Sequence, residues 1–308
     1  MLSDLEFRSK TFKVMTDCFK HKKIIDLICS HKISEELFDK LKIASLLYMS
    51  KSCGFFSLNE NELIKYYENN YNNISCITPN GLITPKNNTI IEYNLLCQAF
   101  YDIINVLNIN HLIQSWHIPL NLRIKLAKPI EANLERAYPT EYLHSDSWFE
   151  ESSYSVTSMI PVMGDLKNNY VEYYEPPKDF VEEWLGPKPS YKDGDGVVEK
   201  YSKVDYIGEK GHLILVDFAT LHRSFRTDQA KTRISIDTTF LLNRNTIDDG
   251  KDIKHIWRED ERASIDVVSN IGKKYMFYFP DDPEVKNSNI DNKGHKHSAR
   301  LEIKKLII

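Results

Sequence analysis

The chain has 308 residues, 42% of them hydrophobic and 27% charged, with a formal net charge of −4. These are ordinary values for a globular protein, and the length is ample for one substantial hydrophobic core. The slightly acidic balance gives no support for a nucleic-acid or anionic-membrane surface, so we expect neither kind of partner.

The start of the chain and its cysteines point to a cytoplasmic protein. Residues 1–6 are acidic and polar, unlike a secretory signal, and no apolar run approaches the roughly 18 residues of a membrane span. The five cysteines all lie in the first third and include no Cys-x-x-Cys pair. An odd number in such a chain predicts free, mostly buried thiols.

Residues 1–118 are predicted to be mainly helical. We expect them to serve the packing of the hydrophobic core and to carry no functional site. Apolar residues recur there at three- and four-residue spacing, and Ser34 is a suitable N-cap for one of the helices. Proline, glycine and asparagine residues between 76 and 89 predict a loop. Helices are expected at about residues 24–29, 37–49, 60–72 and 91–107.

Strands are predicted from residue 121 onward. In residues 121–126 the apolar side chains alternate with Arg123 and Lys125. We expect these two cations to face solvent; the alternative is that one of them lines a pocket. Further strands are expected at residues 144–149, 154–161 and 171–175.

Residues 178–210 are predicted to interrupt the strands. They contain Gly186-Pro187 and Gly194-Asp195-Gly196 together with mixed charge. A connection of this length is usually either a lid that helps to recognise a substrate or an ordered insertion. The two interpretations, substrate lid and variable surface loop, have equal support.

Two strands follow the insertion. Residues 211–218 form an apolar run opened by glycine, which predicts a buried strand with His212 as a packed core histidine. From Arg233 the chain alternates, with Arg233, Ser235 and Asp237 on one face. If that face looks inward, the buried arginine needs an anion such as a carboxylate; if it looks outward, solvent satisfies it.

His144-x-Asp146 is a candidate metal-binding pair. On a strand, residues i and i+2 point to the same side, so an imidazole and a carboxylate would converge. His222, just after the strand at 211–218, could supply a third ligand, and Asp217 is the second choice for the carboxylate. Two imidazoles and one carboxylate leave three metal positions open, as in non-haem Fe(II) oxygenases. Taken alone, the pair could equally be a surface turn.

The order of His144-x-Asp146, His222 and Arg233-x-Ser235 resembles the Fe(II)/2-oxoglutarate-dependent dioxygenases. More narrowly, it is similar to the phytanoyl-CoA-dioxygenase-like branch, including bacterial oxygenases of carbohydrate and natural-product gene clusters. The aromatic pair Trp148-Phe149 and a strand that ends at Pro161 are also similar to that branch. The resemblance extends over about residues 120–243.

The resemblance implies an α+β or mainly β fold: a double-stranded β-helix, the jelly roll of the cupins, buttressed by N-terminal helices. Its core would span residues 119–243, with residues 1–118 packed on it and residues 244–308 as a C-terminal extension, all in one structural domain. Iron would be held by His144, Asp146 and His222. The co-substrate 2-oxoglutarate would contact Arg233, Ser235 and Thr157, with Arg226 as the second choice for the arginine.

The implied reaction uses dioxygen, converts 2-oxoglutarate to succinate and carbon dioxide, and hydroxylates a small polar molecule. A sugar, a nucleotide-linked sugar or a natural-product intermediate is expected, by analogy with the family alone. Asp146 favours hydroxylation over halogenation, because the related halogenases have a small residue at that place. The alternative is a metal-binding cupin-like protein that binds sugar without turnover or acts as a hydrolase or isomerase.

The C-terminal extension is predicted from pattern only. Residues 253–263 could form a helix, and residues 300–308 a closing strand or helix. The aromatic patch at residues 275–279 could pack on the barrel or on a second subunit of a homodimer.

Overall fold

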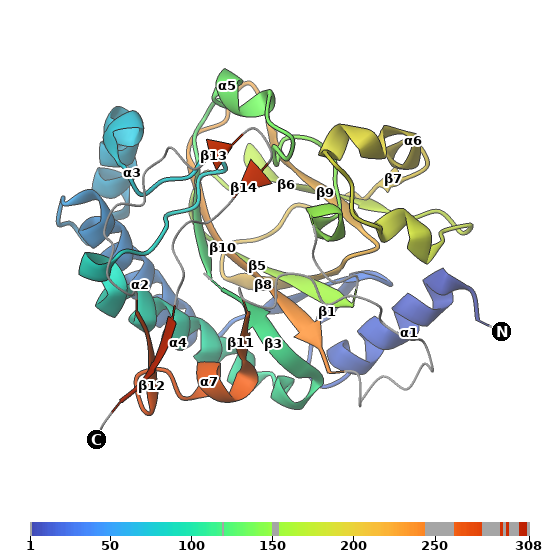
Figure 1. The fold of residues 1–308 in the computed structure, drawn as a ribbon, viewed down its shortest axis with the longest axis horizontal. Helices are drawn as coiled ribbons and strands as arrows, with labels where there is room; N and C mark the ends of the chain where they lie inside the picture. Colours follow the sequence, from blue (N-terminus) through green and yellow to red (C-terminus); the bar gives the residue numbers. More distant parts are fainter. Residues whose placement is uncertain are drawn as a thin grey trace.

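The computed structural model describes residues 2–118, 120–149, 154–243, 262–278, 290–291, 294–295 and 302–306. Helices and antiparallel strands are mixed along this part of the chain. A large and a small sheet lie near the middle of the molecule, and helices α2, α3 and α4 lie together on one side (Figure 1).

The large sheet carries most of the core. Its described strands are ordered β1-β2-β8-β5-β10-β3-β11, and β4 also pairs with β10. All of these pairs are antiparallel. The strands are β1 (Lys22–Ile25), β2 (Ile28–Lys32), β3 (Ile113–His117), β4 (Asn121–Lys125), β5 (Ser155–Gly164), β8 (His212–Asp217), β10 (Arg233–Leu242) and β11 (Arg262–Ser264).

The small sheet has the order β7-β6-β9 in the described residues. Strand β5 leads into β6 through a turn, and β8 leads into β9, so the chain passes twice from the large sheet to the small one; it returns from β7 to β8 and from β9 to β10. A cavity lies between the two sheets and takes side chains from both. The strands are β6 (Asn169–Glu175), β7 (Ser202–Lys203) and β9 (Leu221–Arg226).

Buried side chains of the N-terminal helices belong to the same hydrophobic cluster as the apolar side chains of β4 and β10. Ser34 caps α2 by accepting a hydrogen bond from the Leu37 amide, as predicted, and Gly54 ends it with a φ of 70°. The hydroxyl of Tyr93 on α4 accepts a hydrogen bond from the Leu120 amide next to β4. The main helices are α1 (Asp4–Thr16), α2 (Glu35–Cys53), α3 (Glu60–Asn70) and α4 (Ile90–Val106).

Short helices fill the connections. They are η1 (Tyr71–Asn73), η2 (Asn87–Thr89), η3 (Asn110–Leu112), α5 (Glu131–Leu134), η4 (Asp146–Phe149), η5 (Glu182–Leu185), η6 (Tyr191–Gly194), α6 (Asp195–Val198) and α7 (Ile265–Ser269). The predicted insertion at 178–210 thus contains η5, η6, α6 and β7. No helix of the described residues is long and apolar enough to span a membrane.

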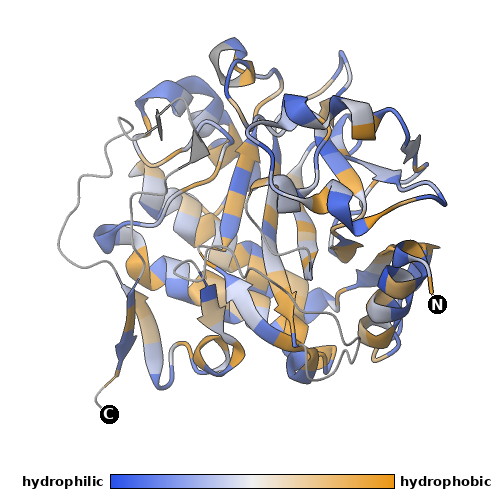
Figure 2. Cartoon of the chain, turned by 45° about the vertical axis from the view of Figure 1, so that its right-hand side comes forward, coloured by the Kyte–Doolittle hydropathy of each residue, from blue (hydrophilic) through white to orange (hydrophobic). Residues whose placement is uncertain are grey.

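Alternation along the strands separates the core from the cavity. On β10, Ile234 and Ile236 are fully buried in the hydrophobic core, while Arg233, Ser235 and Asp237 line the cavity. The prediction of two distinct faces on this strand is therefore confirmed. Orange and blue bands succeed one another along the central strands in Figure 2, as this alternation requires.

One part of the N-terminal prediction was wrong. Residues 24–29 were expected to be helical, but they lie in the hairpin of β1 and β2, and β2 pairs with β8 of the large sheet. Ile28 and Cys29 are buried there. Pairing with β8 satisfies the backbone N–H and C=O groups of β2. This gain outweighs the weak apolar spacing that favoured a helix, because so short an apolar run fits a helix and a strand equally well.

Little of the C-terminal extension is described. Most of the helix predicted at 253–263 lies outside the described residues, and its last residues belong to β11. The aromatic patch forms β12 (Tyr275–Tyr278), which pairs with the closing strand β15 (Glu302–Lys305). Strands β13 (Ile290–Asp291) and β14 (Gly294–His295) form a second small ribbon.

Candidate metal centre

Backbone pairing brings the two candidate histidine ligands together. His144 and His222 form an isolated antiparallel bridge in which each amide donates to the other's carbonyl, at 3.0 and 2.8 Å. Asp146 is not on a strand but begins η4, so the strand predicted at 144–149 was wrong. The helical turn nevertheless brings the Asp146 carboxylate to the same place as the two rings.

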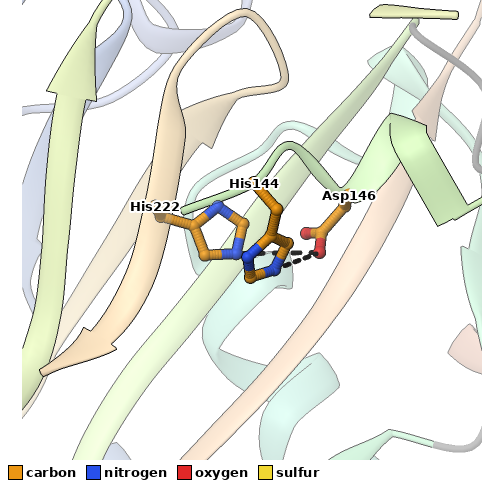
Figure 3. Close-up of side chains that lie close together, drawn as sticks. All are labelled: His144, Asp146 and His222. Atoms are coloured by element: carbon orange, nitrogen blue, oxygen red, sulfur yellow. Dashed lines mark ion pairs between the residues drawn. The ribbon is translucent and has the colours of Figure 1, made fainter. Parts of the chain in front are cut away.

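The three side chains converge on one point. The Nε2 atoms of His144 and His222 lie 3.8 and 3.6 Å from Oδ1 of Asp146 (Figure 3). Candidate ligand atoms of all three residues lie within 4.8 Å of one another, and no other such cluster occurs in the described residues. Two imidazoles and a carboxylate at this spacing suit a divalent metal with open positions.

A carbonyl group orients the first histidine. Nδ1 of His144 lies 2.8 Å from the carbonyl oxygen of Tyr142, so we assign the proton to Nδ1, which leaves the Nε2 lone pair free for a metal. Burial, followed by the neighbouring His222, lowers the pKa of His144 to about 3. The ring is therefore neutral near pH 7, which is the form that binds metal.

Thr157 on β5 contacts the candidate carboxylate ligand. Its hydroxyl donates a hydrogen bond of 2.8 Å to Oδ2 of Asp146. Burial acts to raise the pKa of Asp146, but His222, His144 and this hydrogen bond outweigh it, and the net shift is downward. Thr157 also lines the cavity, and its predicted contact with the co-substrate stays a prediction. Nothing in the sequence indicated the hydrogen bond to Asp146.

The metal-ligand cluster opens into a cavity of about 140 Å³. The large sheet contributes side chains from β4, β5, β8 and β10, and the small sheet from β6 and β9. All six residues singled out as site residues from the sequence line this one cavity: His144, Asp146, Thr157, His222, Arg233 and Ser235.

Arg233 is a buried cation without an anionic partner in the described residues. Only 3% of its surface is exposed, and its Nε has no hydrogen-bond partner in that part of the chain. Burial lowers the pKa of Arg233 to about 10, which still leaves it charged near pH 7. A buried guanidinium of this kind is costly unless an anion binds to it.

A second cation, Lys125, lies opposite Arg233 across the β4–β10 pair. It is buried, donates to the Thr140 hydroxyl, and lies 3.5 Å from a carboxylate oxygen of Glu141. Arg226 pairs with the same carboxylate at 3.1 Å. Lys125 and Arg226 thus share the carboxylate of Glu141, while Arg233, opposite Lys125, has no such acid among the described residues, so basic side chains outnumber acidic ones at this end of the cavity.

The two cations of β4 were expected to face solvent, and this was wrong. Arg123 and Lys125 both line the cavity, because Leu122 and Ile124 on the other face pack in the core. Arg123 forms a bidentate pair with Asp237 on β10, with distances of 2.6 and 3.1 Å. Alternation alone does not show which face of a strand is covered by helices.

The insertion contributes directly to the site. The ring of Tyr191 on η6 stacks on His144, with ring centroids 4.0 Å apart and an interplanar angle of 16°. Its backbone amide donates to the carbonyl of Ala137. Trp148, fully buried beside the metal ligands, donates from its indole nitrogen to the carbonyl of Trp184. Residues 178–210 therefore cover the histidine side of the candidate metal centre.

The second-choice residues have other partners. Asp217 is buried and pairs with Arg8 of α1 at 2.6 Å, away from the metal ligands. Arg226 is engaged by Glu141 and by the carbonyl of Leu126, and it lies at the end of β9, not in a turn. His212 is partly exposed, so its prediction as a packed core residue was wrong.

Comparison with known proteins gave matches among solved structures only. No protein-family model matches the chain, and no curated protein matches it. Several of these structures are named as non-haem or alpha-ketoglutarate-dependent enzymes, the kind that the sequence motifs resemble.

Three of them are proteins that depend on or bind alpha-ketoglutarate (2-oxoglutarate). The non-haem carbocyclase SnoK from nogalamycin biosynthesis is 10% identical, with a TM-score of 0.29, and the match covers 49% of this chain and 55% of that one. The epimerase SnoN from the same biosynthesis is 12% identical, with a TM-score of 0.34 and coverage of 57% and 72%. An N-substituted L-amino acid dioxygenase from Burkholderia ambifaria AMMD is 14% identical, with a TM-score of 0.36 and coverage of 77% and 88%. Because these identities and TM-scores are low, any function proposed for this chain depends on the geometry of its own site.

Proposed function

We propose that this protein is an Fe(II)- and 2-oxoglutarate-dependent oxygenase that hydroxylates a small polar substrate. The observation that carries the proposal is the presence, in one cavity, of a convergent His-Asp-His cluster and a buried arginine that has no anionic partner among the described residues. A metal site alone would not need the arginine, whereas a keto acid bound to the metal offers it a carboxylate.

In this proposal, His144, Asp146 and His222 hold the iron, and the two facing sheets form a double-stranded β-helix. Arg233 and Ser235 bind the far carboxylate of 2-oxoglutarate, and the Lys125 amine lies at the same end, opposite Arg233. Bound iron supplies the dioxygen chemistry that yields succinate, carbon dioxide and the hydroxylated product. The buried side chains of both sheets exclude water and fix the geometry.

The test is an anaerobic titration of the metal-free protein with Fe(II) and then with 2-oxoglutarate, followed by visible absorbance. We expect a weak charge-transfer band that needs both additions, because the keto acid must chelate the bound metal. His144→Ala and Asp146→Ala should abolish the band and iron-dependent turnover. Metal binding without any keto-acid band would refute the proposal in favour of a metal-binding protein of another function.

A further inference from the structure

Two buried polar atoms lining the cavity have no hydrogen-bond partner among the described residues, and neither belongs to the metal or keto-acid contacts proposed above. They are Oδ1 of Asn121 on β4 and Oγ1 of Thr239 on β10. The two residues are only 6% and 8% exposed. Buried polar atoms of this kind are rare in folded proteins, because each loses its hydrogen bonds to water.

The orientation of the Asn121 amide follows from its neighbour. The amide nitrogen donates to Oδ2 of Asp237 at 2.7 Å, and a carboxylate can only accept. The nitrogen must therefore face Asp237, and the amide oxygen is the atom without a hydrogen-bond partner in the described residues. Asn121 thus presents an acceptor whose direction is set, and a ligand must supply a donor to it.

The two unpartnered atoms are close enough for one ligand. Asn121 lies directly opposite Asp237 across the β4–β10 pair, and Thr239 is the next residue of β10 on the same face. Such diagonal neighbours lie roughly 7–8 Å apart, and their Cβ atoms are somewhat closer. Side chains that reach inward from these positions can contact adjacent groups of one small molecule.

Thr239 also lies beside the candidate metal centre. It is opposite Thr157 in the β10–β5 pair, and the hydroxyl of Thr157 donates to the candidate ligand Asp146. A molecule held by Asn121 and Thr239 would therefore be close to the open metal positions. Arg233, in contrast, begins β10 at the cationic end of the cavity.

The charge around these atoms is balanced. Asp237 accepts a hydrogen bond from the Asn121 amide, and Arg123 neutralises this carboxylate through two hydrogen bonds. An amide oxygen and a hydroxyl are themselves neutral, so neither a carboxylate nor an ammonium group finds an unpaired opposite charge here. Neutral hydroxyl groups, which can donate to one atom and exchange hydrogen bonds with the other, match both.

We propose that Asn121 and Thr239 bind two neighbouring hydroxyl groups of a neutral polyol, such as a sugar ring, as the substrate of the oxygenase. This assignment rests on the proposed function for its catalytic meaning, but polyol binding can be measured by itself. It predicts that removal of the Thr239 hydroxyl weakens binding while leaving the fold intact.

The experiment measures binding of the methyl glycosides of glucose, galactose and mannose to the full chain by saturation-transfer NMR titration. The protein is loaded with Zn(II) and 2-oxoglutarate, so that no turnover occurs, and D-glucuronate is the charged comparison. We expect at least one methyl glycoside to bind, and Thr239→Val to weaken it by about 3- to 10-fold, the effect of one hydrogen bond.

Thr238→Val is the matched control. The Thr238 hydroxyl points to the other side of the same strand and donates to the carbonyl of His117 at 2.8 Å. This variant should lose stability in urea unfolding but bind the glycoside as the unchanged protein does. Thr239→Val should keep or gain stability, because it removes a buried hydroxyl without a partner.

Three results would overturn the inference: no methyl glycoside binds, Thr239→Val binds as tightly as the unchanged protein, or glucuronate binds more tightly than every neutral glycoside. Binding of 2-oxoglutarate to the Zn(II)-loaded protein is recorded separately. If that fails while glycoside binding behaves as expected, the proposed oxygenase function is refuted but the polyol site stands.

Discussion

At the scale of single residues, the cavity combines groups that are costly to bury unless a ligand meets them. Arg233 has no anion, and Asn121 and Thr239 have no hydrogen-bond partner, within the described residues. A core selected for stability alone would not keep such groups. Their presence beside the His-Asp-His cluster indicates a site built to hold more than a metal.

Replacing Arg233 tests the keto-acid contact. We expect Arg233→Ala to raise the apparent KM for 2-oxoglutarate by about 30-fold or more, because the far carboxylate would be left without its cation. Metal affinity, measured by calorimetric titration with Mn(II), should change little. Arg223→Ala is the control, since Arg223 pairs with Glu172 and does not line the cavity. An unchanged KM in Arg233→Ala would contradict the assignment.

Lys125 predicts a pH dependence of the stability of the ligand-free protein. Burial, opposed by Glu141 but reinforced by the neighbouring arginines, lowers its pKa from 10.5 to about 7. Between these values the unfolded chain binds more protons than the folded one, so the free energy of unfolding gains a contribution that rises with pH. Below pH 7 the folded protein buries a charged lysine, and the full desolvation cost of that charge lowers the free energy of unfolding.

Lys125→Met should remove this contribution. The free energy of unfolding of both proteins is measured in urea from pH 7 to pH 10. The variant should exceed the unchanged protein most near pH 7, and the difference should shrink as the pH rises. A constant difference across that range would show that Lys125 stays fully charged in the folded state.

At the scale of elements, the insertion at 178–210 is fitted closely to the metal-binding segment. A Cβ added to Gly194 of η6 would lie 2.2 Å from a ring carbon of Trp148, which is fully buried. The same insertion places Tyr191 against the ring of His144. This segment therefore positions a candidate ligand, a role that its length and composition in the sequence left open.

Gly194→Ala should destabilise the protein by about 1–3 kcal/mol, the usual cost of overpacking. The control is Gly196→Ala, because a Cβ on Gly196 meets nothing within 4 Å. Urea unfolding of both variants gives the comparison. Equal stabilities would mean that the insertion moves freely away from Trp148.

At the scale of the whole molecule, a buried ion network joins three distant segments. Arg8 of α1 pairs with Asp217 at the end of β8 and with Glu182 in the insertion, at 2.6 and 3.1 Å. Asp4 accepts a hydrogen bond from the Glu182 amide. The N-terminal helix thus links the large sheet to the segment that covers the metal centre.

Arg8→Met should lower the free energy of unfolding by about 3–5 kcal/mol, because it leaves buried Asp217 without its cation. Lys13→Met, on the same helix, removes a pair whose side chains are 69% and 56% exposed and should have little effect. The measurement is urea unfolding of both. Equal losses in the two variants would show that the network adds nothing to stability.

The sequence by itself determined the two faces of β10, the capped helix after Ser34, and the identity of residues that meet in one cavity. These depend on local rules: period-two alternation, capping and the chemistry of histidine and carboxylate. Only the tertiary structure decided that residues 24–29 lie in a hairpin whose second strand pairs with β8, that Arg123 and Lys125 face inward, and that Asp146 lies on a helical turn. In each case the deciding contact comes from a distant segment, which no local pattern contains.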